Sequence, residues 1–185
     1  MSSRACSLLS VVTLLGGVLA LPTYAAAQTT SQLRKTLVDA INTARASSRG
    51  CGTERMAAVA PLTPNSALTT AAQLHTAEMA ARGRFSHVGV DGSQPWDRAR
   101  KVGYAWRQIG ENIAAGDGSA TGTLRQWLGS AGHCRNLMSP RFREIGVGYA
   151  PGGPHQHVWT VVFAARRPNA WAPPLGHVSP PRSLG

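Results

Sequence analysis

The C-terminal half of the chain holds two strand patterns that together restrict the possible fold. Ile145, Val147 and Tyr149 alternate with glycines, so one side of this strand is bulky and the other almost bare. Residues 158–165 form a nearly continuous apolar run, which is typical of a central strand covered on both faces. A proline- and glycine-rich turn at residues 151–154 joins the two strands. We therefore expect an antiparallel hairpin inside a layered domain.

Segments before these strands have the spacing of amphipathic helices. The expected helices are residues 31–48, 64–83, 93–103 and 121–130, and a further strand is expected within residues 109–114. Thr63 is expected to cap the second helix, with Pro64 as its first residue. Residues 50–60 are expected to form a loop. Helices that precede and alternate with strands indicate an α+β layered domain.

The first 27 residues have the pattern of a secretory signal peptide. Arg4 is followed by an apolar run that ends at Leu21, and small residues at 25–27 favour cleavage after Ala27. The run of about 14 residues is short for a membrane span, which needs about 20. We therefore expect a secreted or periplasmic monomer without a transmembrane span. Its single domain is expected over residues 28–165, followed by a flexible proline-rich tail at 166–185.

The charge of the chain is strongly positive. The sequence has 19 basic and 8 acidic residues, so loss of Arg4 with the signal peptide leaves 18 basic residues and a net charge of +10. These charges are scattered along the chain and are not interleaved with aromatic residues, which argues against a nucleic-acid partner. Non-specific attraction to an anionic envelope surface remains an expectation.

Two cysteines, Cys51 and Cys134, remain after the predicted signal peptide. An even number in an oxidising compartment favours a disulfide between them. A free or metal-bound Cys134 is the alternative that the sequence leaves open. Because Cys134 follows His133 directly, a disulfide would also anchor that histidine.

Three polar residues from separate segments are the candidates for chemistry: His87, Glu111 and His133. Two neutral imidazoles and a carboxylate can bind zinc or a similar ion and leave a position for water. The same groups can also transfer protons without a metal. A serine nucleophile is not indicated, because the chain has no GxSxG elbow. We expect His75, on the apolar face of a predicted helix, to be packed and not to be a ligand.

Four segments resemble a known family. FSHVGVDGSQPWDRARKVGY at 85–104, GENIAAG at 110–116, WLGSAGHCRNLMSPRFREIGVGYA at 127–150 and WTVVFA at 159–164 follow its order and spacing. The family is the bacterial branch of the CAP superfamily, also called SCP-like, which groups cysteine-rich secretory, antigen 5 and pathogenesis-related 1 proteins. The resemblance extends from about Leu33 to Ala164, which is nearly all of the chain after the predicted signal peptide. It implies an α-β-α sandwich with a central antiparallel sheet and a large cleft.

The resemblance also implies a site. His87 matches the first histidine of the family, Glu111 the acidic residue of its GEN motif and His133 the histidine of its GH motif. The position of a second acidic residue falls on Ser130, so Glu111 and Ser130 are expected to line the cleft. His87 and His133 are then expected to hold a divalent cation such as zinc.

Members of the family are linked to lipid or sterol binding, to metal-dependent effects and in isolated cases to proteolysis. We therefore expect a secreted binding module that engages an apolar ligand or an anionic envelope component, and we favour this over an enzyme. One alternative is a metal-assisted hydrolase with Glu111 as base beside His87 and His133. The other alternative is a structural or interaction protein with no metal-dependent role.

Overall fold

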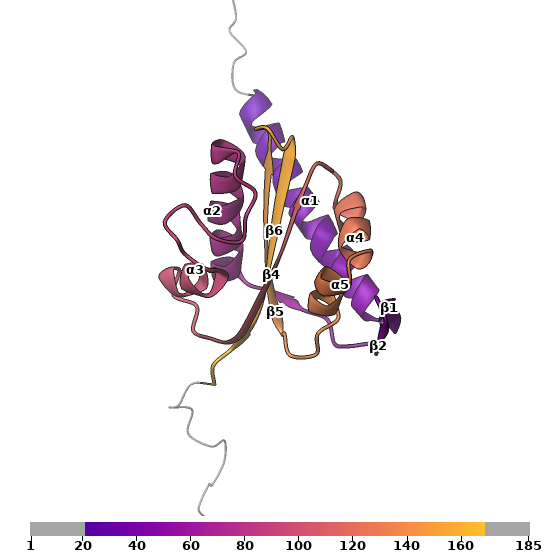
Figure 1. Ribbon diagram of the computed structural model, residues 1–185. Helices are drawn as coiled ribbons and strands as arrows, with labels where there is room; N and C mark the ends of the chain where they lie inside the picture. Colours follow the sequence, from indigo (N-terminus) through magenta and orange to yellow (C-terminus); the bar gives the residue numbers. More distant parts are fainter. Residues whose placement is uncertain (1–20, 169–185) are drawn as a thin grey trace, which may run out of the picture.

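A computed structural model describes residues 21–168 of the chain. The elements in chain order are α1 (Leu21–Arg45), β1 (Arg49–Cys51), β2 (Glu54–Met56), β3 (Thr63–Pro64), α2 (Ser66–Arg82), α3 (Pro95–Lys101), β4 (Trp106–Ala115), α4 (Ala120–Leu128), α5 (Ala131–Leu137), β5 (Glu144–Pro151) and β6 (His157–Arg166). One sheet stands between two helical layers, with α2 and α3 on one side and α1, α4 and α5 on the other (Figure 1). This arrangement confirms the expected α-β-α sandwich.

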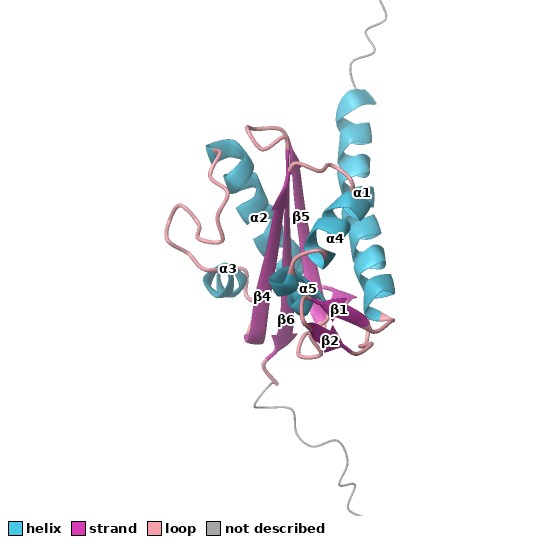
Figure 2. Ribbon diagram, turned by 45° about the vertical axis from the view of Figure 1, so that its right-hand side comes forward, coloured by secondary structure: helices cyan, strands magenta, loops and turns pink. Residues whose placement is uncertain are grey.

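The main sheet has the strand order β3-β5-β6-β4. β6 is antiparallel to both of its neighbours, β5 and β4, as expected for the hairpin and the central strand. The two-residue strand β3 pairs with β5 in the parallel sense, so the sheet is antiparallel except at this short edge. The opposite edge is β4, which runs beside α5 and past α3 (Figure 2). Residues on β4 can therefore meet side chains from both helical layers.

Strand β6 supplies apolar side chains to both layers. Trp159, Val161 and Phe163 belong to the large core cluster shared with α1 and α4, and none of them is exposed. Val162 and Ala164 belong to a second cluster, on the α2 and α3 side. The strand is thus buried on both faces, which explains why its sequence is apolar and does not alternate.

The glycines of β5 allow α2 to approach the sheet closely. A Cβ atom built at Gly146 would lie 2.1 Å from the backbone carbon of Leu68, and one at Gly148 would lie 2.5 Å from the carbonyl oxygen of Ala72. No side chain fits at these distances. The bare side of the predicted strand is therefore the surface on which α2 packs.

Helix α2 has the predicted buried face but a different start. Its buried residues include Leu68, Ala72, His75 and Met79. The prediction that Thr63 caps the helix and Pro64 begins it is wrong, because both residues pair with β5 as strand β3. Asn65 is the N-cap instead, and its side-chain oxygen accepts the backbone N–H of Leu68 at 3.2 Å.

Three other local predictions need correction. Residues 50–60 are not a plain loop, because β1 and β2 form a small antiparallel hairpin there. Helix α1 ends at Arg45, three residues before the predicted end. The helix predicted to reach residue 130 ends at Leu128, and a separate helix, α5, follows at Ala131–Leu137. Helix α5 has only seven residues, and Gly132 is one of them, so its sequence shows no clear helical periodicity.

The predicted termini fall largely outside the described residues. Residues 1–20 of the predicted signal peptide and residues 169–185 of the predicted tail are not described. Helix α1 includes Ala27, after which cleavage is predicted, and β6 extends to Arg166. Within residues 21–168, no helix has the length and apolar character to cross a membrane.

Candidate functional site

His87 and Glu111 lie in contact. His87 belongs to the segment between α2 and α3, and Glu111 lies in the edge strand β4. The His87 Nδ1 atom is 2.9 Å from Glu111 Oε1. Since a carboxylate oxygen only accepts, Nδ1 carries the hydrogen of this bond, and in a neutral ring the lone pair is then on the other nitrogen, Nε2. The His87 side chain is 47% exposed, whereas that of Glu111 is only 2% exposed.

The second oxygen of Glu111 is bound by an arginine that the sequence patterns did not single out. Arg98 on α3 places its Nη2 atom 2.7 Å from Glu111 Oε2, and its own side chain is 8% exposed. The same nitrogen donates to the carbonyl oxygen of His87 at 3.1 Å, and Nη1 donates to that of Ser93 at 2.7 Å. Arg98 therefore fixes the Glu111 carboxylate and also the backbone of His87, whose ring the carboxylate orients.

His75, on α2, also lies close to Glu111, with its Nε2 atom 4.0 Å from Glu111 Oε1. It is 2% exposed, and its Nε2–H donates to the carbonyl oxygen of Ser86 at 2.9 Å. Burial lowers the pKa of His75, and the negative charge of Glu111 opposes that shift while Arg98 adds to it. A packed, neutral His75 agrees with the expectation from the sequence.

His133 is attached to the same strand from the other helical layer. Asn112, next to Glu111 on β4, donates from Nδ2 to the carbonyl oxygen of His133 at 3.1 Å. Asn136 donates to the side-chain oxygen of Asn112 at 2.9 Å and to the carbonyl oxygen of Glu111 at 3.3 Å. Two neighbouring residues of β4 thus bind to opposite helical layers: Glu111 binds His87, and Asn112 binds α5.

The electrostatic environment of the His133 ring includes the charge of His87. Burial is the main cause that lowers the pKa of His133, and the charge of His87 lowers it further. No hydrogen bond joins the His133 ring to His87 or Glu111 in the described part of the chain. The described residues 21–168 also hold no group of three His, Cys, Asp or Glu side chains placed to bind a metal. A cation held by His87 and His133 stays a prediction.

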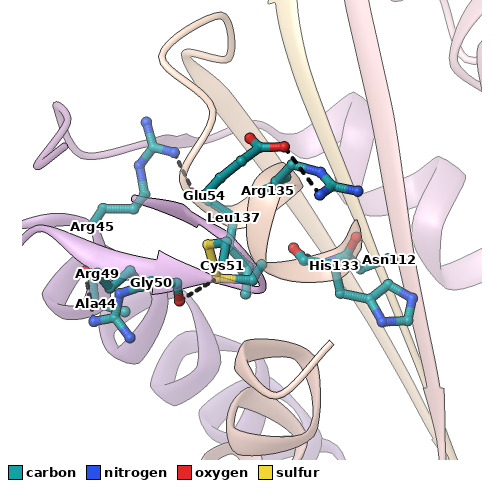
Figure 3. Close-up of a disulfide and its surroundings, with 11 residues drawn as sticks. Ala44, Arg45, Arg49, Gly50, Cys51, Glu54, Asn112, His133, Arg135 and Leu137 are labelled. Carbon is teal, nitrogen blue, oxygen red and sulfur yellow. Dashed lines mark hydrogen bonds and ion pairs between the residues drawn. A yellow bond between two sulfur atoms is a disulfide. The ribbon is translucent and has the colours of Figure 1, made fainter. Parts of the chain in front are cut away.

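The predicted disulfide is present. Cys51 at the end of β1 and Cys134 in α5 are bonded, with Cα atoms 5.3 Å apart, and neither is exposed. Figure 3 shows that the His133 imidazole points away from the disulfide and towards the strands. The bond therefore ties α5 to the β1–β2 hairpin from the side opposite His133, and the alternative of a free Cys134 is wrong.

Ser130, the fourth residue expected at the site, is the N-cap of α5. Its side chain makes no capping hydrogen bond, and its carbonyl oxygen accepts the backbone N–H of Cys134 at 2.8 Å. The position is three residues before His133. A role for Ser130 in lining the cleft stays a prediction.

Residues 38–163 match the family model of the cysteine-rich secretory protein family, CAP. The match covers well over half of the chain, and the chain belongs to this family. A curated relative, the uncharacterised protein YkwD of Bacillus subtilis, is 30% identical over 106 residues, which are 57% of this chain and 40% of YkwD. The uncharacterised membrane protein YlbC of the same organism is 31% identical over 74 residues, which are 40% of this chain and 21% of YlbC. The chain thus spans well under half the length of these relatives.

Solved structures share the fold. An extracellular protein from Bacillus anthracis that contains an SCP domain superposes with a TM-score of 0.65 at 24% identity, over 82% of this chain and 45% of that one. An outer surface protein from Borrelia burgdorferi superposes with a TM-score of 0.65 at 19% identity, over 75% of this chain and 96% of that one. At these identities the likeness establishes the α+β CAP fold.

Proposed function

We propose that the chain is an exported binding module that holds a divalent cation, such as zinc, between His87 and His133. The observation that supports this most is the bond between His87 Nδ1 and Glu111 Oε1. Metal-binding histidines usually donate their second ring N–H to a carboxylate, which sets the tautomer and the ring orientation. The bond supports that role for Glu111, and Nε2 of the half-exposed His87 ring would then be the ligand atom.

A neutral ring would also allow His133 to bind the cation. Only a neutral imidazole binds a metal, and the lowered pKa of His133 keeps its ring neutral over a wider pH range. A bound cation would supply a positive centre that attracts an anionic or polar group of an envelope ligand. His87 and His133 would hold it, while Glu111 and Arg98 would fix the His87 ring.

Export and an envelope ligand are parts of the same proposal. The predicted signal peptide favours export, and two relatives of the same fold are described as an extracellular protein and an outer surface protein. The excess of basic residues favours anionic partners through non-specific attraction. An apolar ligand in the predicted cleft, which the family resemblance implies, is the second class of ligand that we propose.

The surroundings of Glu111 weigh against a hydrolase. A general base must reach the water that it activates. Both oxygens of Glu111 are bound, one to His87 and the other to Arg98, and its side chain is 2% exposed. The carboxylate is thus placed to orient a neighbour, which favours binding over catalysis.

Isothermal calorimetry with zinc chloride tests the proposed cation site. The wild type is expected to release a saturable heat, and the variant His87→Ala/His133→Ala is expected to lose it. His155→Ala is the control for the loss of a histidine outside the proposed ligand pair, because the His155 ring donates to the carbonyl oxygen of Gly83 and packs on Phe85. Equal heats from the wild type and the double variant would remove the proposal.

A further inference from the structure

A cavity of about 170 Å³ lies between α2, α3 and the segment that joins them. His75, Glu78 and Arg98 line it, together with an apolar wall made by Ala71 and Val102. Neither His87 nor His133 lines this cavity. It is therefore a second candidate site, connected to the first through Arg98 and His75.

His75 presents a hydrogen-bond acceptor without a protein donor. Because Nε2–H is used by the carbonyl oxygen of Ser86, the neutral ring carries its lone pair on Nδ1. Nδ1 is buried and makes no hydrogen bond within the described part of the chain. Its closest charged neighbour, Glu78 Oε2, is another acceptor at 3.5 Å. A group that donates a hydrogen would satisfy this nitrogen.

Arg98 presents the complementary group. Its two terminal nitrogens are used by Ser93, His87 and Glu111. Its Nε–H is buried and has no acceptor among the described residues. Buried polar atoms in proteins are nearly always hydrogen-bonded. His75 and Arg98 both line the cavity, and each has one unmatched buried nitrogen, which points to a common ligand. That ligand must both donate and accept.

The charges around the cavity favour a neutral ligand. The guanidinium of Arg98 is balanced by Glu111 at 2.7 Å, and Lys101 is balanced by Asp91 at 2.5 Å. The His75 lone pair and Glu78 would repel an anion. A cation that only donates hydrogen bonds would leave the Nε–H of Arg98 unmatched. A hydroxyl group is neutral and serves as donor and acceptor at once.

The rest of the cavity suits a short aliphatic group. Ala71 and Val102 form its wall, and Leu74, which is 62% exposed, lies at its rim. We propose that this cavity binds a small neutral ligand whose hydroxyl donates to His75 Nδ1 and accepts from Arg98 Nε, with its aliphatic part against Ala71 and Val102. This site does not depend on a cation at His87 and His133.

The test compares 2-butanol with butanone, which has nearly the same shape but no hydroxyl donor. The readout is the ¹⁵N signal of His75 Nδ1 in long-range ¹H–¹⁵N spectra of the full chain. A saturable shift is expected with 2-butanol, with a Kd on the order of millimolar for so small a ligand. Butanone is expected to bind about tenfold more weakly, because it leaves the His75 acceptor unmatched.

Variants separate the cavity from other surfaces. Ala71→Leu and Val102→Phe each extend a side chain into the cavity and are expected to abolish the saturable shift, and either one that folds serves the test. His87→Ala/His133→Ala is expected to bind 2-butanol like the wild type, so loss of zinc binding and loss of alcohol binding are distinguishable. Three results would overturn the proposal. Butanone could bind as tightly as 2-butanol, or a folded variant with a filled cavity could still bind 2-butanol. The wild type could also show no saturable shift, as expected if only water enters the cavity.

Discussion

Arg98 Nη2 and Glu111 Oε2 lie 2.7 Å apart, with side chains 8% and 2% exposed. This ion pair joins α3 to the edge strand β4 and fixes the carboxylate to which His87 donates. Removal of one member of a buried ion pair leaves the other charge without compensation, which is far more costly than the loss of an exposed pair. The pair is therefore a structural support of the proposed site.

Arg98→Met is expected to lower the free energy of unfolding by about 3 kcal/mol. The comparison variant is Arg100→Met, on the same helix. Arg100 is exposed and lies 3.6 Å from Asp97, so loss of this ion pair should lower the free energy of unfolding by under about 1 kcal/mol. Urea denaturation of both variants measures the difference. Similar costs for the two would show that the Arg98–Glu111 pair adds no more than a surface contact.

The disulfide between Cys51 and Cys134 closes a loop with a sequence separation of 83 residues. The double variant Cys51→Ala/Cys134→Ala is expected to lose about 4 kcal/mol of unfolding free energy. Because the bond anchors α5, which carries His133, zinc affinity should fall as well. Urea denaturation and calorimetry check the two effects, and an unchanged zinc affinity would mean that Asn112 and Asn136 hold α5 without the bond.

Gly146 on β5 leaves no room for a side chain. Gly146→Ala would place a methyl group 2.1 Å from the backbone of Leu68, so α2 would have to move, at a cost of about 3 kcal/mol. Gly50→Ala is the control, because a Cβ atom there meets nothing within 4 Å. Thermal unfolding of both variants tests this packing, which is contradicted if the two melt at the same temperature.

Stability is expected to fall in mild acid. The folded-state pKa values of His75 and His133 are both lowered, mainly by burial, so below about pH 6.5 the unfolded chain binds protons that the native chain does not. The stability that depends on these two histidines being neutral is fully present above that pH and is lost progressively as the pH falls. Urea denaturation at pH 7 and pH 5 measures the change. His75→Gln is expected to lessen the decrease, and an equal decrease in this variant would exclude His75 as its source.

The sequence predicted the elements whose periodicity reflects burial. The apolar run of β6 and the glycines of β5 each result from layers packed on the sheet. Helix α5 and the β1–β2 hairpin were missed because they are short and are held by the Cys51–Cys134 bond and by Asn112, contacts that no local pattern encodes.

The site was predictable only in part. The resemblance identified His87 and Glu111, which the structure brings into contact. Arg98 was missed because its role depends on where α3 packs against β4. The one local sign was its place three residues after the buried Pro95, on the inner face of a short helix. The unmatched nitrogens of His75 and Arg98 are likewise tertiary features.

Diffraction from a crystal soaked in zinc, recorded at the zinc absorption edge, tests the central claim most directly. The account predicts an anomalous peak bonded to His87 Nε2 and to the His133 ring, with Glu111 still accepting from His87 Nδ1. A crystal of His87→Ala/His133→Ala, soaked in the same way, should show no peak there. Two imidazoles that point apart in the wild type, or zinc bound only elsewhere, would contradict the account.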